Sequence, residues 1–373
     1  MSYDPNAGKS NPEKSNAGRS LDDKSLRVGI LTGGGDCPGL NAVIRAVVRK
    51  AERHYGDSVI GFKDGWKGLL EDESRLLDIE SLRGTLPRGG TIIGTSRVQP
   101  YMFEDGVARV SDTVRRHSLD ALIVIGGEGT LSVAYEIHKE GILPVIGVPK
   151  TIDNDIACTE MTFGFQTAVQ IAVDAIDRLH TTAESHHRVM IVEVMGRHVG
   201  HIATWTGIAG GATMILVPEQ PFDINKVASI LQHRHETNRY ASIVVVAEGA
   251  QPIPGTFELP DKEMDEYGHV KLGGIGSIIA SELEKRTGMD TRVTVLGHIQ
   301  RGGTPNAFDR VLCSRFGVAA IDAVHEGVMG EMVALQSGNI TKVPLGDAVA
   351  GLKGITDELW QTAKVFFPPL PSD

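Results

Sequence analysis

Short apolar runs rich in β-branched residues recur along this chain, and polar glycine-rich loops follow several of them directly. Residues 121–125 read Ala-Leu-Ile-Val-Ile and lead into Gly-Gly-Glu-Gly-Thr at 126–130. Further runs of this kind alternate with helical patterns and lie at 26–32, 58–62, 143–148, 188–195, 214–217, 242–247 and 292–296. Such alternation predicts an α/β fold with mainly parallel sheets and right-handed crossovers. Because open α/β sheets place ligands at the carboxyl ends of their strands, the loops after these runs are the first candidates for a functional site.

The length of 373 residues suggests two domains, and no repeat of fixed period is present. Residues 1–25 are polar and predict a disordered tail. The Gly-Lys-Ser at 8–10 is not the end of a Walker A loop, because no strand precedes it and Tyr3 stands where the first glycine would be. A helical pattern over 163–185 predicts the entry to a second lobe, residues 251–268 predict a Pro-rich acidic loop, and the C-terminal part predicts one strand and one helix.

The composition limits the partners and the compartment. A formal charge of −10 argues against nucleic acid or anionic lipid, so an anion-binding site must be a local cluster of Arg and Lys. No run approaches the roughly 18 apolar residues that a membrane span needs. Cys37, Cys158 and Cys313 are few and widely spaced, which fits a reducing compartment, and the N-terminus has no apolar core of a signal peptide. We therefore expect a soluble cytoplasmic protein.

The first glycine loop is Gly-Gly-Gly-Asp-Cys-Pro-Gly at 33–39, between the strand at 26–32 and a helical pattern over 40–54. Strand, glycine loop and helix form an arrangement in which backbone N–H groups and a helix N-terminus bind phosphate. The sequence is neither Gly-x-Gly-x-x-Gly nor a Walker loop, so it does not specifically indicate dinucleotide binding. A simple tight turn stays the alternative.

The second glycine loop, 126–130, carries the carboxylate of Glu128. A carboxylate would repel a bare phosphate, but it suits a divalent cation that lies between the two groups. Mg²⁺ typically uses one or two carboxylates together with phosphate oxygens.

The acidic loop, Pro-Lys-Thr-Ile-Asp-Asn-Asp at 149–155, follows the next strand. Asp153 and Asp155 are two residues apart and can face one crevice, where one takes a proton from a hydroxyl and the other holds a metal. Lys150 and Thr151 can offer a cation and a hydroxyl to a phosphate or sugar oxygen. The alternative for this loop alone is plain turn chemistry. Three successive strand ends that carry glycines and acids favour a metal–phosphate site.

A group of basic residues marks the second half of the chain, at strand ends or just before strands. In an acidic protein such a cluster predicts a site for an anionic substrate such as a sugar phosphate, bound by guanidinium groups. Each residue alone would be typical of a solvated surface. The group consists of Arg188, Arg197, Arg292, His298 and Arg301.

The chain after the tail resembles the bacterial-type 6-phosphofructokinases, through motifs that occur in the same order. These are Gly-Gly-Asp at 34–36 with Pro38, Gly39 and Asn41, the second glycine loop, 151–155, Met-Gly-Arg at 195–197, and Leu-Gly-His-Ile-Gln-Arg-Gly-Gly-Thr-Pro at 296–305. The last motif is highly specific. The resemblance is to an actinobacterial-like group that mixes ATP-dependent and pyrophosphate-dependent members.

This resemblance implies two similar Rossmann-like lobes with the active site in the cleft between them. The nucleotide-binding lobe would comprise 26–163 with roughly 300–350, and the sugar-phosphate-binding lobe 164–299. Residues 351–373 would form a C-terminal extension.

The resemblance also implies Mg²⁺-assisted phosphoryl transfer to the 1-hydroxyl of fructose 6-phosphate, giving fructose 1,6-bisphosphate. Asp153 would be the base, and Thr151, Arg97 and Arg197 would complete the catalytic set. Glu128 and Asp155 would hold the metal. The nucleotide would contact Gly34, Arg97, Val98, Gly127, Glu128, Gly129 and Thr130. The sugar phosphate would contact Thr151, Ile152, Asp153, Arg188, Met195, Gly196, Arg197, Glu248, Arg292, His298, Ile299, Gln300 and Arg301.

Arg188 and Arg292 match family positions that reach the substrate of a neighbouring subunit. The resemblance therefore implies active sites shared between subunits of a homo-oligomer, with a tetramer as the expected assembly. It does not tell us where allosteric effectors bind.

Two positions bear on the phosphoryl donor, and they point in opposite directions. ATP users resemble one another in having Gly at position 129, whereas pyrophosphate users have Asp, which would repel the nucleotide's α-phosphate. Lys150 is typical of pyrophosphate users, although an extra cation suits either donor. We give Gly129 more weight and expect ATP, with pyrophosphate as the alternative.

Other classes fit the motifs less well. A regulatory sugar-phosphate-binding protein without activity would be expected to lack Asp153 or Glu128, and both are present. A nicotinamide-dependent dehydrogenase would need a Gly-x-Gly-x-x-Gly loop. Lipid and NAD kinases share a loop similar to 126–130 but not the motif at 296–305.

Overall fold

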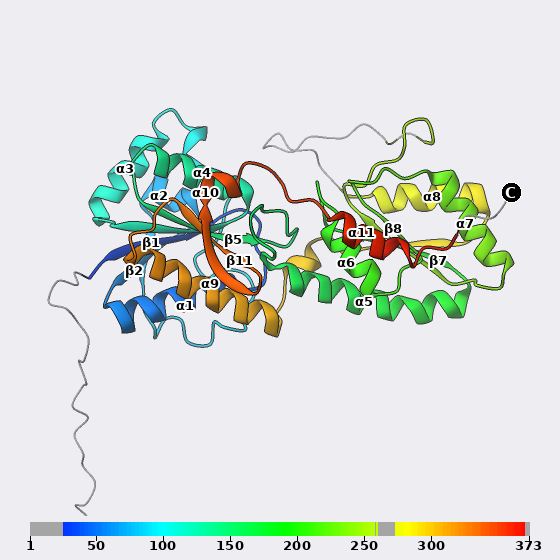
Figure 1. Cartoon of the computed structure of the whole chain (residues 1–373), viewed down its shortest axis with the longest axis horizontal. Coiled ribbons are helices and arrows are strands. Elements are labelled where there is room, and N and C mark those ends of the chain that lie inside the picture. Colours follow the sequence, from blue (N-terminus) through cyan, green and yellow to red (C-terminus); the bar gives the residue numbers. More distant parts are fainter. Residues whose placement is uncertain (1–24, 258, 260–272, 370–373) are drawn as a thin grey trace, which may run out of the picture.

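The computed structural model describes residues 25–257, 259 and 273–369, and these form two α/β lobes that lie side by side (Figure 1). The expected tail at 1–25 lies outside the described residues except for its last one, as does most of the expected loop at 251–268. The prediction of an α/β fold with mainly parallel sheets in two lobes is confirmed. The residue boundaries that we expect for the lobes stay predictions.

The first lobe is built on an eight-stranded sheet. Its strands are β1 (Arg27–Thr32), β2 (Ser58–Phe62), β3 (Ser74–Leu77), β4 (Ala121–Gly126), β5 (Val145–Thr151), β6 (Phe163–Gly164), β11 (Glu331–Gln336) and β12 (Asn339–Pro344). The order is β12-β11-β5-β4-β1-β2-β3, and β6 pairs with β5. The edge strands β3 and β12 run antiparallel to their neighbours, and the other pairs are parallel.

The second lobe has a four-stranded sheet in which each pair is parallel, with the order β10-β7-β9-β8. Its strands are β7 (Val189–Val194), β8 (Met214–Leu216), β9 (Ser242–Ala247) and β10 (Thr291–Val295). The side chains of β7 and β9 are buried along their whole length, because helices cover both faces of the sheet. This explains why these strands read as continuous apolar runs rather than as alternating patterns.

Helices cover both faces of the first sheet (Figure 1). On one face α1 (Leu40–Lys50) packs against α9 (Ala307–His325), and on the other lie α2 (Trp66–Glu71), α3 (Gly106–His117), α4 (Glu128–Lys139) and α10 (Leu345–Ala348). The helix expected over 40–54 continues past α1 as a π-helical turn, η1 (Ala51–Tyr55), and η2 (Pro100–Met102) is a short 3₁₀ turn.

The second sheet is covered in the same way. The helices α5 (Phe165–His186) and α6 (His201–Ala209) pack together, as do α7 (Ile224–Glu236) and α8 (Ile275–Thr287), and α11 (Asp357–Lys364) packs on α6. A 3₁₀ segment, η3 (Gly297–Arg301), follows β10. In the described part of the chain, no helix is both long enough and apolar enough to cross a membrane.

The expectation of one strand and one helix in the C-terminal part is wrong. This part forms the hairpin of β11 and β12, followed by α10 and α11. Ser337 and Gly338 both have positive φ, +48° and +77°, as the tight turn of such a hairpin requires. The second strand is only partly buried, so its apolar signal is weak.

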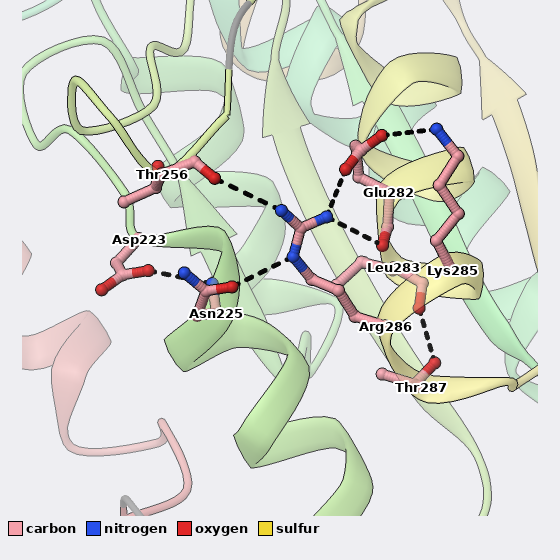
Figure 2. Close-up of polar contacts among 8 residues, drawn as sticks. All are labelled: Asp223, Asn225, Thr256, Glu282, Leu283, Lys285, Arg286 and Thr287. Atoms are coloured by element: carbon pink, nitrogen blue, oxygen red, sulfur yellow. Dashed lines mark hydrogen bonds and ion pairs between the residues drawn. The ribbon is translucent and has the colours of Figure 1, made fainter.

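A cluster of polar contacts around Arg286 anchors the outer helices of the second lobe (Figure 2). Its Nε donates to Asn225 Oδ1 at 3.0 Å and its Nη2 to the Thr256 carbonyl at 3.3 Å, while Nη1 pairs with the Glu282 carboxylate. Asp223 caps α7 by accepting from the Asn225 N–H at 2.9 Å. The end of α8 is thereby joined to the start of α7 and to the loop at Thr256.

A buried carboxylate on α9 caps the helix that connects the two lobes. Asp309 is 0% exposed and accepts hydrogen bonds from the Gly164 N–H at 3.0 Å and the Thr167 N–H at 2.8 Å, and from Thr167 Oγ1 at 2.5 Å. Two donors that the first turn of α5 would otherwise leave unpaired are therefore satisfied from a different element. This contact fixes the start of α5 against the first lobe.

We expect Asp309→Ala to lower the free energy of unfolding by about 2–4 kcal/mol, because it leaves buried N–H donors without acceptors and removes a helix cap. Urea denaturation followed by circular dichroism measures the change. The control is Asp177→Ala, which removes an exposed carboxylate from α5 and should change the free energy by less than about 0.5 kcal/mol. Equal losses in the two variants would contradict the role of the cap.

Candidate active site

The first glycine loop, the second glycine loop and the acidic loop follow β1, β4 and β5, which are neighbours in the first sheet. All three strands are parallel, so their carboxyl ends lie at one edge. The Gly33 N–H donates to the Ile125 carbonyl at 3.0 Å, which joins the first glycine loop to the end of β4. The expected convergence of these three strand ends is what the structure shows.

Glycine is required where these loops touch. A Cβ at Gly33 would lie 2.6 Å from Thr130 Cγ2, and a Cβ at Gly35 would lie 2.5 Å from Arg301 Nη1. Real Cβ atoms do not approach other atoms so closely, so these positions let the backbone pack directly against side chains. The second of these contacts brings a guanidinium of the second lobe to the first glycine loop.

The second glycine loop contains the N-terminus of α4. Gly127 is the N-cap residue and offers no side chain, so the first N–H groups of the helix remain available to an anion. A Cβ at Gly129 would meet no atom within 4 Å, so the space beside it is open. Ser132 Oγ donates to Glu128 Oε1 at 3.2 Å and orients that carboxylate at the helix start.

The acidic loop turns so that its two aspartates share one side. Asn154 lies between them with a positive φ of +53°, and its side chain is buried. Asn154 Oδ1 accepts from the Thr162 N–H at 2.9 Å, and the Asp153 N–H donates to Thr151 Oγ1 at 3.0 Å. With Asn154 directed inward, Asp153 and Asp155 are each only partly buried. The expectation that both carboxylates can face one crevice fits this geometry.

The pKa of Asp153 is raised to about 7, chiefly by burial and also by the Asp155 and Glu248 carboxylates, while Arg301 and Lys150 act in the opposite direction. Its Oδ1 is buried and has no hydrogen-bond partner among the described residues. A carboxyl group with a pKa near neutrality and a free oxygen atom can accept a proton from a substrate hydroxyl.

Lys150 lies inside the site rather than at its rim. The side chain is 3% exposed, and its Nζ donates to the Gly35 carbonyl at 2.5 Å. Burial lowers the pKa of the ammonium group. Lys150 therefore holds the acidic loop against the first glycine loop, a structural function that its sequence position did not indicate.

The second lobe contributes a facing set of residues at the carboxyl ends of β7 and β9. Met195, Gly196 and Arg197 follow β7, and Glu248 follows β9. The Gly249 N–H donates to the Gly196 carbonyl at 3.1 Å, which holds the two strand ends together. Burial raises the pKa of Glu248, and nearby Arg197 lowers it.

Arg301 connects this set to the first lobe. It stands at the end of η3, and its Nη1 donates to the Asp36 carbonyl at 3.3 Å. Because Arg301 and Glu248 both act on the pKa of Asp153, residues of both lobes surround that carboxylate. The candidate site is thus the cleft between the lobes.

Arg97 and Val98 lie beside the first glycine loop. The Gly34 N–H donates to the Ser96 carbonyl at 3.1 Å, and Thr95 Oγ1 donates to the Gly34 carbonyl at 2.6 Å. Val98 packs at the edge of the hydrophobic core, while Arg97 is exposed. The three nucleotide-binding candidates at 34, 97 and 98 are therefore close together.

The prediction that the five basic residues form one cluster is wrong. Arg188 and Arg292 lie at the amino ends of β7 and β10, and each pairs with Asp290 at 2.5 Å. Because the strands are parallel, these amino ends lie at the opposite edge of the sheet from the carboxyl ends near Arg197 and Arg301. The distance is roughly 20 Å for a six-residue strand. Arg197, His298 and Arg301 remain at the cleft side.

Two further candidates differ from the simple expectation of side-chain contact. Ile152 is fully buried in the core, so only its backbone can face a ligand. Gln300 is 0% exposed, and its Nε2 donates to the Gly297 carbonyl at 3.2 Å, which stabilises the turn of η3. Ile299 and His298 are exposed on the same turn.

Glu128 and Asp155 fit a magnesium ion that also binds phosphate oxygens. Burial raises the pKa of Asp155, and the negative charge of Glu128 raises it further, so a cation between them would relieve unfavourable charge. Among the described residues no group of three or more His, Cys, Asp or Glu could hold a metal ion. Two carboxylates are nevertheless the usual protein share of a Mg²⁺–phosphate site.

Comparison with known proteins agrees with this geometry, which is that of an α/β phosphotransferase with a two-lobed cleft. The sequence profile of the phosphofructokinase family matches residues 27–324. The chain therefore belongs to the phosphofructokinase family.

Two relatives cover nearly the whole chain and differ in the donor that they are named for. The pyrophosphate–fructose 6-phosphate 1-phosphotransferase of Streptomyces coelicolor is 56% identical over 342 residues, which are 92% of this chain and 100% of the relative. The ATP-dependent 6-phosphofructokinase of Mycobacterium leprae is 53% identical over 343 residues, again 92% of this chain and 100% of the relative. The expected resemblance to a group that mixes both donors is confirmed.

The solved structure of Pichia pastoris phosphofructokinase in the T-state superposes with a TM-score of 0.77 and 31% sequence identity. The match covers 92% of this chain and 36% of that chain, so this chain spans about a third of its length.

Proposed function

We propose that this protein transfers a phosphoryl group from ATP to the 1-hydroxyl of fructose 6-phosphate, with Mg²⁺, and so forms fructose 1,6-bisphosphate. The observation that carries the proposal is the position of Asp153. Its carboxylate lies between the phosphate-type loops of one lobe and Arg301 of the other, with a pKa raised to about 7. A donor phosphate on one side and an anionic sugar on the other would meet at this group.

Asp153 would accept the proton of the attacking hydroxyl, since its buried Oδ1 has no partner among the described residues. Arg197 and Arg301 would bind the 6-phosphate through paired N–H donors, and Glu248 would accept from sugar hydroxyls. Met195, Gly196 and His298 would complete this side. Phosphoryl transfer depends mainly on positioning and on neutralising charge, which such an arrangement provides.

The donor would lie against the first and second glycine loops, with its phosphates at the N-terminus of α4. Arg97 would contact the transferring group, and Thr151 would line the same pocket. Glu128 and Asp155 would hold Mg²⁺, which neutralises phosphoryl charge when bound.

Arg188 and Arg292 support the proposal of shared active sites. They lie at the amino ends of their strands, away from Arg197 and Arg301, so they cannot contact a substrate in the cleft of their own chain. Arg292 is exposed and Arg188 is partly exposed, and both charges suit contact with the substrate of a neighbouring subunit, in a homo-oligomer that we propose to be a tetramer.

Two observations support ATP as the donor. A Cβ at Gly129 would meet no described atom within 4 Å, so the space beside this residue is open to the nucleotide's further phosphates. The Lys150 ammonium already donates to the Gly35 carbonyl at 2.5 Å, so this lysine has a structural task that does not depend on pyrophosphate. The same lysine and the 56% identity to a pyrophosphate-dependent relative favour pyrophosphate as the second candidate donor.

Initial rates with fructose 6-phosphate and Mg²⁺, measured with ATP and with pyrophosphate in separate reactions, test the donor. We expect product with ATP alone, because Gly129 leaves the nucleotide space open. Turnover with pyrophosphate alone would show that Lys150 outweighs that space. Turnover with neither donor would favour a regulatory protein that binds sugar phosphate without activity.

We expect Asp153→Asn to lower kcat by about 10²–10⁴-fold with little change in the KM for fructose 6-phosphate, because the amide cannot accept the hydroxyl proton. Steady-state kinetics with both substrates varied measure the effect. Asp347→Asn, at an exposed position on α10, is the matched control and should leave kcat unchanged. Near-normal turnover of Asp153→Asn would sink the assignment of the base.

We expect Gly129→Asp to weaken ATP, measured as the KM for ATP, far more than pyrophosphate, measured by its binding, because the new carboxylate would repel the α-phosphate. The backbone of Gly129 is helical and a Cβ there meets no atom within 4 Å, so the variant should fold normally. Gly129→Ala separates charge from bulk and should retain ATP kinetics. If both variants leave the KM for ATP unaltered, Gly129 does not determine the donor.

A further inference from the structure

The chain crosses between the lobes a third time near its C-terminus. The interlobe segment, residues 352–356, runs from α10 in the first lobe to α11 in the second (Figure 1). Leu352 forms an isolated antiparallel bridge with Ile156, the residue after the acidic loop. The segment therefore passes directly behind the residues that carry Asp153 and Asp155.

Lys353 makes an unusually complete set of hydrogen bonds to this region. Its Nζ donates to Asn154 Oδ1 at 3.0 Å, to the Thr159 carbonyl at 2.7 Å and to the Glu160 carbonyl at 2.9 Å. Its backbone N–H donates to the Asp155 carbonyl at 2.8 Å. All three N–H bonds of the ammonium can thus be used, and each of them acts on the chain between 154 and 160.

Asn154 is the residue through which these bonds can reach the two aspartates. It has a φ of +53°, in the left-handed region that Asn adopts more readily than most other non-glycine residues. Its Oδ1 accepts from Lys353 Nζ and from the Thr162 N–H, and its Nδ2 donates to the Glu160 carbonyl at 3.3 Å. Rotation of Asn154 would redirect Asp153 and Asp155 together.

Packing alone does not support the acidic loop on this side. An open pocket of about 470 Å³ lies beside it, lined by Asn154, Thr159 and Met161 together with His201, Trp205 and Lys353. Lys353 lines this pocket, so its hydrogen bonds to Asn154 and Thr159 add to the packing that holds the loop.

The interlobe segment is itself fixed to the second lobe. His201 Nε2 donates to the Lys353 carbonyl at 2.9 Å, and the Ile355 N–H donates to Glu219 Oε1 at 3.2 Å. Glu219 Oε1 also accepts from the Gly200 N–H at 2.9 Å. Gly200 and His201 end the loop that carries Arg197, so the segment connects both sides of the cleft.

We infer that Lys353 is a positioning residue for phosphoryl transfer. It holds Asn154 so that Asp153 and Asp155 face the cleft, and through the interlobe segment it sets their place relative to Arg197. The inference rests on the proposed function, since it assumes that Asp153 acts in the reaction.

The test is Lys353→Met, which keeps the length and the backbone hydrogen bonds but removes the three bonds of Nζ. We expect kcat to fall by about 10- to 100-fold, because small displacements of reacting groups have effects of this size. The KM values for sugar phosphate and donor should change by less than about threefold, since Arg197 and the glycine loops keep their places. Amide hydrogen exchange over residues 153–162 should become faster.

Two further variants make the test specific. Lys364→Met removes an exposed lysine from α11 and should leave kcat and exchange unchanged. Asn154→Gly keeps the positive φ while removing the acceptor, so it should reproduce the loss of kcat. The kcat of the double variant should be no lower than that of the slower single variant, because both changes remove the same Lys353–Asn154 hydrogen bond.

A Lys353→Met enzyme with kcat within twofold of the unaltered protein and unchanged exchange over 153–162 would overturn the inference. So would a loss of kcat that is matched by an equal loss of folded protein in thermal unfolding, because that result indicates a merely structural role. If the unaltered protein shows no turnover with either donor, the proposed function fails. Slower kcat in Lys353→Met alone, with the unaltered protein active, supports the positioning role.

Discussion

The adjacency of three parallel strands is the constraint on which this site depends. Because β5, β4 and β1 are neighbours in one sheet, the loops that follow them meet at a single edge. The close approach of Thr130 to Gly33 leaves no room for a Cβ, so the loops share one rigid surface. A phosphate bound by one loop is therefore within reach of the carboxylates carried by the next, and the sheet alone ensures this.

The cleft balances buried charges by contacts between separate parts of the chain. Lys150 donates a hydrogen bond to the first glycine loop, and Arg301 of the other lobe donates one to the same loop. The Asp153 carboxylate lies among these cations and among the carboxylates of Asp155 and Glu248, which act on its pKa in the opposite sense. Since ligands add further charge to the cleft, its protonation and its occupancy must be linked.

Asp309 and Lys353 show how the relative position of the two lobes is fixed. Asp309 caps α5 where the chain first enters the second lobe, and Lys353 binds the acidic loop where the chain crosses again. Both use charged side chains to satisfy backbone groups of another element, which gives directional restraint without a large apolar interface. Such contacts fix the orientation of the catalytic groups while leaving the cleft accessible.

The sequence alone determined the α/β class, most strand positions, the three loops, and the family resemblance, because local patterns and short motifs encode these features directly. It did not predict the strand β12, whose apolar signal is weak, and the residue pattern alone grouped Arg188 and Arg292 with the cleft residues, although both precede or begin their strands while Arg197 follows one. Only the tertiary structure decided which polar groups meet and which are buried. Lys150 donates a hydrogen bond to Gly35, Gln300 is buried, and Lys353 donates a hydrogen bond to Asn154, 199 positions away. Such pairings depend on distances between residues far apart in the chain, and no local pattern carries that information.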